Sequence, residues 1–284
     1  MRFAITGCDN SLGVFESFLQ AGWEPVKLFT FSTEDSLESN RQIIDLAQSN
    51  RINVQLSRMT GEDLRELGQR GCEVLVVSGY KWRIGDWRPH LRYAVNFHPS
   101  PLPEARGPYP LVRAIMDGRR LWAVSCHKVE NDFDTGAILA NEMLRLDAME
   151  CHERLSLRIQ MASMRLAERV AKELVNLWNA AQPQGAGDYW PSPSREDRTI
   201  DFFYPVASIM QKVRALGLLG CLARVNDVWI CAKRVVGWEE EHTHLSGSVV
   251  HINNQSIVVA ASDGYIGIIE WILVTGAPSK VAVK

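Results

Sequence analysis

The sequence predicts an α/β fold, with a parallel, doubly wound sheet in the first part of the chain and a smaller β-rich domain after it. Short apolar strands alternate with helices of about ten residues over the first half, which is typical of βαβ units. A stretch rich in proline and glycine, Gln182–Arg198, then ends this pattern, and short strands with turns predominate beyond it. The 284 residues are enough for two such domains.

The first elements follow from the spacing of apolar residues. We expect strands at residues 2–7, 26–31, 53–56, 73–78 and 93–97, and helices at residues 11–21, 36–48 and 61–69. The strand at 73–78 is an unbroken apolar run rich in valine, which is typical of a parallel strand that is buried on both faces. These elements predict a parallel sheet covered by helices on both sides.

The later elements change character. Alternating polar and apolar residues predict two strands, 123–129 and 135–144, joined by the loop 130–134. A long amphipathic helix is expected at 153–180. The stretch 182–198 that follows excludes regular structure, and we interpret it as an interdomain linker.

The boundaries of the domains follow from this interpretation. We place the first domain at residues 1–187, the linker at 188–198 and the β-rich domain at 199–284. The last domain is expected to begin with one helix, 206–216, followed by several short strands separated by turns such as Asn226-Asp227. This pattern predicts a small barrel or sandwich.

The composition excludes several classes of protein. Hydrophobic residues make up 46% of the chain and charged residues 23%, which excludes a disordered or collagen-like chain. No apolar run approaches the roughly 20 residues of a membrane-spanning helix, and the N-terminus lacks the pattern of a signal peptide. The six cysteines form no Cys-x-x-Cys pair, so neither a zinc site nor a disulfide framework is expected, and we expect a protein of the reducing cytoplasm.

The charge distribution bears on possible partners. The formal net charge of −2 argues against a chain that binds nucleic acid strongly. From Pro191 onward, nine lysine and arginine residues are balanced by nine aspartate and glutamate residues. The C-terminal third is therefore neutral.

The turn after the first strand is the usual place for a dinucleotide fingerprint. Here it contains Gly7 and Gly13, six residues apart, and no Gly-x-Gly-x-x-Gly. A tight turn from strand to helix explains it, so a nicotinamide enzyme is the less favoured alternative.

The densest chemical signal follows the strand 93–97. The fifteen residues from Asn96 to Pro110 contain five prolines and a glycine, which predicts a rigid loop at the carboxyl end of a parallel strand, where α/β sheets bind ligands. Asn96 and His98 are two apart on a strand, so their side chains point to the same side. An amide that stabilises an oxyanion beside an imidazole that moves a proton suits carbonyl chemistry. The alternative is that both side chains only satisfy the backbone of the loop.

A second segment, Asn131–Gly136, is either a simple hairpin turn or part of the same site. Together the two segments resemble the folate-dependent formyltransferase family. The resemblance rests on Asn-x-His-Pro-Ser-x-Leu-Pro-x-x-Arg-Gly from Asn96, Ala-Ile-x-x-Gly at 114–118, and His-x-Val-x-x-x-x-Asp-Thr-Gly-x-Ile-Leu at 127–139. Thr199–Phe202 also resembles the entry to the family's C-terminal β domain, so the resemblance extends loosely over most of the chain.

The resemblance implies a fold and a set of site residues. It implies a Rossmann-like catalytic domain followed by an OB-like barrel, and it places Asn96, His98 and Asp134 at the three catalytic positions. It also implies a pocket for the cosubstrate 10-formyltetrahydrofolate between two loops. The residues expected to line that pocket are Tyr80, Trp82, Arg83, Ile84, Gly85, Val129, Glu130, Asn131 and Phe133.

The remaining histidines are given simpler interpretations. His242 and His244 follow the acidic run Glu239–Glu241 and are expected at a solvated surface, so no metal is expected. His127 lies on the strand that leads to Asp134, where it either helps to hold that loop or packs in the core.

The formyl acceptor is expected to be a small-molecule amine, such as a nucleotide-linked amino sugar or an amino-acid-derived biosynthetic intermediate. The tRNA-modifying members of the family carry a long basic loop after the second strand, which favours a polyanion. Here that place, Thr30–Glu38, is short and acidic, which disfavours tRNA, as does the neutral C-terminal third. The presence of a C-terminal domain favours tRNA, so methionyl-tRNA stays the alternative acceptor. A hydrolase that releases formate from the same donor is a further alternative, and the three catalytic residues argue against a non-catalytic binding module.

Overall fold

The computed structural model describes residues 1–32 and 39–274, which form two compact units. The first unit contains residues 1–110, 121–146 and 156–191, and the second contains residues 111–120, 147–155 and the chain from Ser192 onward. Two short stretches of the N-terminal part therefore belong with the C-terminal residues. The boundaries 1–187, 188–198 and 199–284 stay a prediction, because this interleaved division does not decide where the chain passes from one domain to the next.

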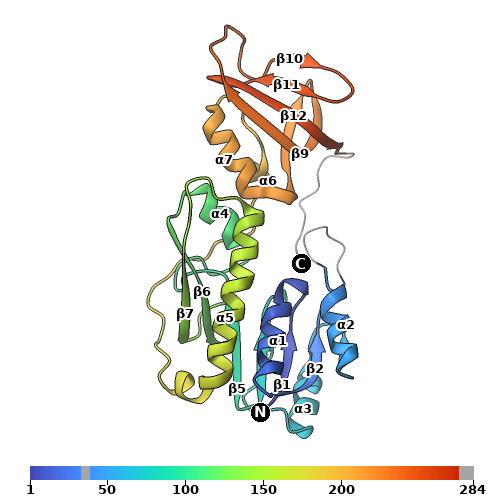
Figure 1. Cartoon of the computed structure of the whole chain (residues 1–284), viewed down its shortest axis with the longest axis vertical. Helices are drawn as coiled ribbons and strands as arrows, with labels where there is room; N and C mark the ends of the chain where they lie inside the picture. Colours follow the sequence, from blue (N-terminus) through green and yellow to red (C-terminus); the bar gives the residue numbers. More distant parts are fainter. Residues whose placement is uncertain (33–38, 275–284) are drawn as a thin grey trace. The chain divides into compact units, whose positions relative to one another are not determined.

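The first unit is built on one seven-stranded sheet (Figure 1). The strands are β1 (Arg2–Thr6), β2 (Glu24–Phe29), β3 (Asn53–Gln55), β4 (Val74–Val77), β5 (Tyr93–His98), β6 (Leu121–Lys128) and β7 (Ile138–Arg145). Their order is β3-β2-β1-β4-β5-β6-β7. The first five strands in this order pair in parallel, β6 is antiparallel to β5, and β7 is antiparallel to β6. The predicted doubly wound, Rossmann-like sheet is confirmed.

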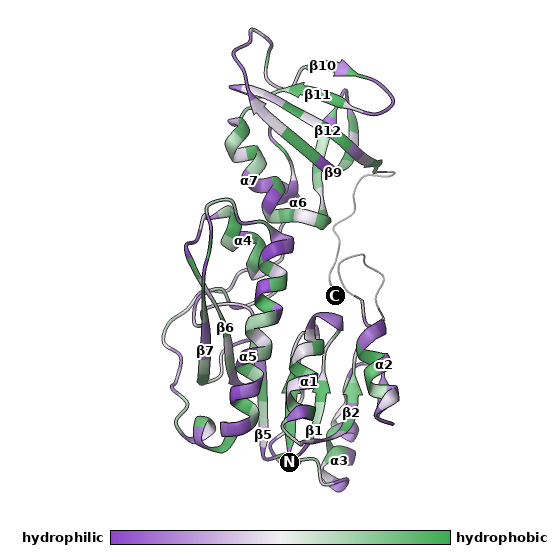
Figure 2. Cartoon of the chain, in the orientation of Figure 1, coloured by the Kyte–Doolittle hydropathy of each residue, from purple (hydrophilic) through white to green (hydrophobic). Residues whose placement is uncertain are grey.

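The central strands are buried on both faces, as their apolar sequences require. On β1, Phe3 packs against Phe15 of helix α1 (Leu12–Gln20), with ring centroids 5.9 Å apart. The next residue, Ala4, faces the opposite side and joins the cluster that contains Leu64 and Leu67 of α3 (Gly61–Gln69). Figure 2 shows the resulting hydrophobic run along the central strands. Each fully buried large side chain stabilises the fold by about 1.5–3 kcal/mol.

The other helices of the first part are α2 (Arg41–Ser49), α4 (Pro110–Met116) and α5 (His152–Asn179). The helix expected at 36–48 is present as α2, while residues 36–38 lie outside the described residues. The stripe predicted for α5 is buried, with Leu155, Leu166 and Val170 at most 1% exposed. In the described residues, no helix is both long and apolar enough to cross a membrane.

The second unit contains a five-stranded antiparallel sheet and helix α7 (Val206–Leu216). The strands are β8 (Cys221–Val225), β9 (Val228–Glu239), β10 (Val249–Ile252), β11 (Ile257–Ala260) and β12 (Gly264–Leu273), in the order β10-β11-β12-β9-β8. The β-rich character predicted for this part is confirmed. The strands β9 and β12, at 12 and 10 residues, are longer than the short strands expected, and β8 and β10 form the two edges.

The stretch 182–198 contains more structure than the sequence predicts. A four-residue helix, α6 (Arg195–Arg198), begins at Ser194, whose side chain accepts a bond from the backbone of Asp197 while the Asp197 carboxylate accepts one from the Ser194 backbone. This capping box satisfies the first N–H groups of a helix and explains why regular structure forms among so many prolines. The expectation of no regular structure is therefore wrong for residues 195–198.

Candidate active site

Strand β5 carries two of the predicted site residues, Asn96 and His98, at its carboxyl end. The strand pairs in parallel with β4 on one side and antiparallel with β6 on the other. The two-residue period of a strand points both side chains to the same face. His98 is buried and Asn96 is partly exposed, so the pair sits where an α/β sheet meets a ligand.

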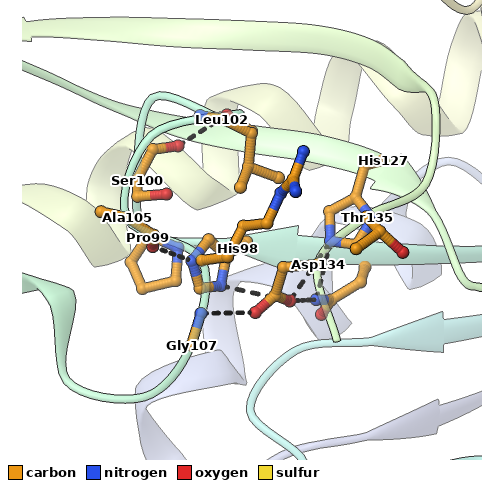
Figure 3. A network of polar contacts seen from close by, with 12 residues as sticks. His98, Pro99, Ser100, Leu102, Ala105, Gly107, His127, Asp134 and Thr135 are labelled. Carbon is orange, nitrogen blue, oxygen red and sulfur yellow. Dashed lines mark hydrogen bonds and ion pairs between the residues drawn. The ribbon is translucent and has the colours of Figure 1, made fainter. Parts of the chain in front are cut away.

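Asp134, in the turn between β6 and β7, lies beside His98 (Figure 3) and also contacts Asn96. Asn96 Nδ2 donates to Asp134 Oδ1 over 3.1 Å, and His98 Nδ1 lies 3.5 Å from the same oxygen. The other carboxylate oxygen accepts a bond of 2.9 Å from the backbone N–H of Gly107. Asp134, which is 36 residues after His98 and 38 after Asn96, is thus brought next to the pair on β5.

His127 is a fourth member of this group, a place that the sequence left open. The register of β5 and β6 sets His127 directly opposite Asn96. Its Nε2 lies 3.0 Å from Asn96 Nδ2 and 3.5 Å from Asp134 Oδ1, and its Nδ1 lies 2.7 Å from the carbonyl of Lys128. Since a carbonyl only accepts, Nδ1 carries the proton of the neutral ring and Nε2 accepts from Asn96. A cross-strand alignment of the two histidine-bearing strands is the signal that would have identified it.

The ring of His98 is held between two hydrogen-bond acceptors. Its Nε2 lies 2.9 Å from the carbonyl of Ala105, and its Nδ1 faces Asp134. Burial lowers the pKa of His98 below its usual value, although the negative charge of Asp134 and the Ala105 carbonyl act in the opposite direction. At neutral pH the imidazole is therefore neutral and able to accept a proton.

The carboxylate of Asp134 stays ionised although it is only 9% exposed. Burial alone would raise its pKa, but the neighbouring His98 and His127 and the N–H of Gly107 together lower the pKa of Asp134 to about 2. The site therefore combines a fixed negative charge with a neutral imidazole, a pair suited to taking up one proton.

The backbone around this group adopts left-handed conformations that side chains disfavour. Asp134 has φ of 57°, and in the facing loop Ala105 and Tyr109 have φ of 59° and 54°. Gly136 does not have a left-handed φ, but it is sterically restricted. A Cβ added at this position would lie 1.8 Å from the carbonyl oxygen of Lys128. Conformations of this kind persist only where the surrounding structure holds them, and they gather at functional sites.

Residues 80–85 form the first of the two loops predicted to line the folate pocket. This loop contains an aromatic cluster and a packed aliphatic residue. Tyr80 and Trp82 meet edge to face at 5.2 Å, and Tyr80 Oη accepts a bond of 2.6 Å from the backbone of Met59. Ile84 packs against the core cluster of the first unit, and Gly85 has ordinary van der Waals space beside it. The structure thus leaves Trp82, partly exposed, as the flat side chain of this loop.

Residues 129–133 form the second predicted loop of the pocket, and charged side chains connect it to the first loop. Arg83 lies 3.4 Å from Asp132 and stacks over the ring of Phe133, and Arg88 pairs with Glu130. Arg83 thus lies against Asp132 and Phe133, next to the turn of Asp134, whereas Glu130 is held by Arg88.

Two other residues predicted for the second loop differ from these. Val129 is buried, its N–H donates to the carbonyl of Ala94, and its own carbonyl accepts from Trp87, so it serves the core. Asn131 is exposed. Whether either residue contacts a ligand stays a prediction.

The other histidines singled out in the sequence lie in the second unit. His242 Nε2 donates to the carbonyl of Gly264 over 3.0 Å, and its ring lies 4.7 Å from that of Tyr265. Within residues 1–32 and 39–274, no group of three or more histidine, cysteine, aspartate or glutamate side chains is arranged to hold a metal ion.

Comparison with known proteins identifies the family. The profile described as formyl transferase matches residues 35–170, and that of the formyl transferase C-terminal domain matches residues 193–282. A methionyl-tRNA formyltransferase of Coprothermobacter proteolyticus is 33% identical over 176 residues, which cover 60% of this chain and 58% of that protein. The chain thus spans less than two thirds of this relative.

Solved structures with the same fold extend over nearly the whole chain. The N-formyltransferase from Helicobacter canadensis, in complex with folinic acid and dTDP-3-aminofucose, has a TM-score of 0.65 at 15% identity and covers 95% of this chain and 99% of its own. HypX from Aquifex aeolicus, in complex with tetrahydrofolic acid, has a TM-score of 0.65 at 18% identity, over 95% of this chain and 44% of that one. At these identities the similarity shows the fold. Through the two profiles, which together match most of its length, the chain belongs to the formyl transferase family.

Proposed function

We propose that this protein transfers a formyl group from 10-formyltetrahydrofolate to a primary amine. The observation that carries the proposal is the convergence of Asn96, His98 and Asp134 at the carboxyl end of β5. An ionised carboxylate, a neutral imidazole and an amide within hydrogen-bonding range are the groups that acyl transfer to an amine requires. Membership in the formyl transferase family supports the same reaction.

The proposed transfer proceeds by addition of the amine and elimination of tetrahydrofolate. The neutral amine attacks the formyl carbon and forms a C–N bond, and the formyl oxygen takes up negative charge. The bond between that carbon and N10 of the donor then breaks, and tetrahydrofolate leaves with a proton at N10. The attacking amine loses a proton to the pair of His98 and Asp134, which is deprotonated at the start, and the pair returns a proton to the leaving nitrogen.

The side-chain amide of Asn96 first has to be released from its neighbours. Its two N–H groups are directed at Asp134 Oδ1 and His127 Nε2, and the reverse orientation would set its oxygen against the carboxylate. Donation to the developing oxyanion therefore replaces one of these bonds. A donor placed in this way contributes about 3–4 kcal/mol to the stabilisation of the transition state.

The two loops next to the site fit a flat heteroaromatic donor. Phe133 is the residue next to Asp134 and its ring lies against Arg83, which also joins the loops through Asp132. We infer that Tyr80–Gly85 and Glu130–Phe133 hold the pterin, with its formyl-bearing side directed at the carboxyl end of β5. The folate-bound neighbours in the same fold support this inference.

The acceptor that the charges favour is a small-molecule amine. A chain that grips tRNA has to neutralise several phosphates. In the second unit, however, Arg224 pairs with Asp227 over 2.7 Å, and Lys233 donates to the carbonyls of Leu218 and Leu219. The cations of this unit that could assemble into a basic face are Arg214, Arg224, Lys233 and Arg234, and two of these four are thus engaged in contacts within the chain. The acidic loop 33–38, which also argues against tRNA, lies outside the described residues.

Nucleotide-linked amino sugars and amino-acid-derived amines are the acceptors to test first. The Helicobacter canadensis structure, whose complex contains a nucleotide-linked amino sugar, covers almost the whole of both chains. The sequence relatives favour the second candidate, methionyl-tRNA, because the Coprothermobacter proteolyticus protein is named for it.

The test is a transfer assay with a panel of acceptors. The protein is incubated with 10-formyltetrahydrofolate and with nucleotide-linked amino sugars, amino acids or methionyl-tRNA, and formylated products are measured by mass spectrometry. We expect formylation of a small amine. Formylation of methionyl-tRNA alone would establish the second candidate, and formate release at one rate with and without every amine would establish a hydrolase.

A thermal shift tests the donor separately. A reduced folate such as 5-formyltetrahydrofolate binds only the folded protein, so at one hundred times its dissociation constant it should add about 2.7 kcal/mol of stability. NADH should leave the melting temperature unchanged. A shift with NADH and none with the folate would contradict the proposed donor.

A further inference from the structure

The segment 182–190, which we call the strap, crosses both parts of the chain that form the site. Gln182 exchanges two backbone hydrogen bonds with Ile138, the first residue of β7 after the turn of Asp134. Arg106, in the loop after β5, donates its N–H to Asp188 over 3.0 Å and accepts from Trp190 over 2.7 Å. The strap therefore joins the loop after β5 to the turn of Asp134, although the sequence pattern indicates only a linker.

Within the strap, the side chain of Gln184 makes four hydrogen bonds. Its Nε2 donates to the carbonyls of Asp134 and Gly136 over 2.9 and 2.7 Å. Its Oε1 accepts from Nε and Nη2 of Arg106 over 3.0 and 2.8 Å. An amide has two donors and two acceptor positions, so the bonding capacity of Gln184 is fully used.

These bonds act on two segments whose backbone is strained. Asp134 has a left-handed φ, and its backbone carbonyl is held by Gln184. Ala105 has a left-handed φ as well; its N–H donates to Asp188 Oδ1 over 2.9 Å, and its carbonyl faces His98 Nε2. Since such conformations are unfavourable for residues with a side chain, they need contacts of this kind to persist.

We propose that Gln184 is a positioning residue for the site: it fixes the turn of Asp134 against the loop of Arg106 and thereby sets the contact between Asp134 and His98. The inference deepens the proposed formyl transfer and rests on it. Gln184 touches neither His98 nor Asn96 in the structure and acts through the backbone of Asp134. Loss of the Gln184 hydrogen bonds should let the carboxylate of Asp134 move. A displacement of about 1 Å can reduce turnover 100-fold.

The protonation of His98 reports this position. The titratable and charged groups that face its ring in the described residues are Asp134 and His127, and Arg106 follows Ala105 on the loop and points to Gln184. The charge of Asp134 raises the pKa of His98 against the effect of burial. If the turn of Asp134 loosens, the pKa of His98 falls further. A purely structural role of Gln184 would leave the pKa of His98 unchanged.

The test compares two glutamines of the strap. Gln184→Met keeps the length of the side chain and adds no charge, but removes all four hydrogen bonds. Gln182→Met is the matched control, because the Gln182 side chain is exposed and donates only to the carbonyl of Ala180. For Gln184→Met we expect kcat to fall about 10- to 100-fold with KM of the folate donor within about threefold, and the acidic limb of the pH profile to move to lower pH. Gln182→Met should match the unaltered protein in kcat, in KM of the folate donor and in the pH profile.

Nuclear magnetic resonance separates this inference from the proposed reaction. The ring of His98, assigned by the loss of its signal in His98→Asn, is titrated in the unaltered protein and in Gln184→Met without any substrate. A lower midpoint in Gln184→Met supports the inference even if no formyl transfer is found, in which case only the proposed function fails. An unchanged midpoint overturns it. A fall in kcat that only follows a loss of thermal stability, with an unchanged pH profile, overturns it as well.

Discussion

At the scale of single residues, the proposed proton transfer depends on the imidazole of His98, which lies between the carbonyl of Ala105 and the carboxylate of Asp134. A neutral imidazole leaves one of its two nitrogens facing an acceptor without a proton to donate. The ring is therefore ready to accept a proton, while its burial disfavours the charged form that results. This balance sets the pH range in which the site can work.

The pH dependence of catalysis follows from the same balance. Since burial lowers the pKa of His98, its neutral form persists below the ordinary value of about 6.5 for a histidine. We expect kcat/KM to be constant at neutral pH and to fall on acidification with an apparent pKa below 6.5. Measurement of kcat/KM between pH 5 and 8 checks this, and a limb centred at or above 6.5 would contradict a neutral, buried His98 as the proton acceptor.

Gly136 is the residue whose replacement should most directly disturb the turn of Asp134. In Gly136→Ala the added Cβ would lie 1.8 Å from the carbonyl oxygen of Lys128, so β6 and the turn have to separate. Overpacking of this kind costs about 1–3 kcal/mol, and we expect turnover to fall at least about tenfold. Gly185→Ala, where nothing lies within 4 Å of the new Cβ, is the control in thermal melting and activity assays. Equal activity of the two variants would show that the turn does not need its present form.

At the scale of elements, the sequence predicts best what depends on periodicity. The apolar spacing locates β4, β5 and α5 to within a residue or two, because the burial of alternating or helical faces leaves a regular pattern. The motif around Asn96 and His98 predicts the candidate site, because side chains two residues apart on a strand point to the same face.

Contacts that do not follow the periodicity of a helix or strand cannot be predicted from the sequence pattern. His127 belongs to the site through a cross-strand register, and Gln184 belongs through a segment without any helix or strand. Both depend on where the chain returns in space, which propensity and spacing do not encode. The helix α6 is different, since the pattern Ser194-x-x-Asp197 could have predicted it.

A buried ion pair joins β2 to α3 and gives an element-scale prediction. Lys27 Nζ lies 2.9 Å from Asp63 Oδ1, and both side chains are less than one sixth exposed. Burial alone would raise the pKa of Asp63, but the bonds from Lys27, Thr60 and Gln55 lower it to about 2. A carboxylate with a lowered pKa stabilises the fold above its ordinary value near 3.8, and this contribution is lost as the pH falls through about 2.

Removal of the Lys27 cation should therefore destabilise the protein in a pH-dependent way. We expect Lys27→Met to lower the free energy of unfolding by about 3 kcal/mol at pH 7, because it leaves the buried carboxylate of Asp63 uncompensated. The deficit should shrink as the pH approaches 3. Urea unfolding at both pH values measures it, with Arg169→Met, which breaks an exposed pair with Glu173, as the control expected to cost under about 1 kcal/mol. Equal costs for the two variants at pH 7 would refute the role of the pair.

At the scale of the whole molecule, the choice of acceptor depends on the distribution of charge. The chain carries 31 basic and 33 acidic residues, and the described cations of the second unit include some that are bound to carboxylates or backbone carbonyls. The proposed small amine needs only the candidate site at the end of β5, whereas tRNA would need a basic surface that neutralises several phosphates.

This distribution predicts weak binding of tRNA. In an electrophoretic shift assay at about 0.1 M salt, we expect initiator methionyl-tRNA to bind no more tightly than a non-specific RNA, with a dissociation constant above about 10 μM. A non-cognate tRNA and an unrelated acidic protein serve as controls. Micromolar binding specific to the methionyl-tRNA, with a steep loss of affinity in salt, would refute the small-amine acceptor.

Whether Asn96, His98 and Asp134 transfer a formyl group from the folate to an amine is decided by following a labelled formyl carbon. The protein is mixed with 10-formyltetrahydrofolate labelled at the formyl carbon and with the amine found in the acceptor panel, and the label is located by mass spectrometry. We predict that the label enters the amine product, and that Asn96→Ala, His98→Asn and Asp134→Asn each slow this transfer by about 100-fold or more while their circular dichroism is unchanged. Label that stays in the folate or appears only as formate, or three variants as active as the unaltered protein, would contradict the account.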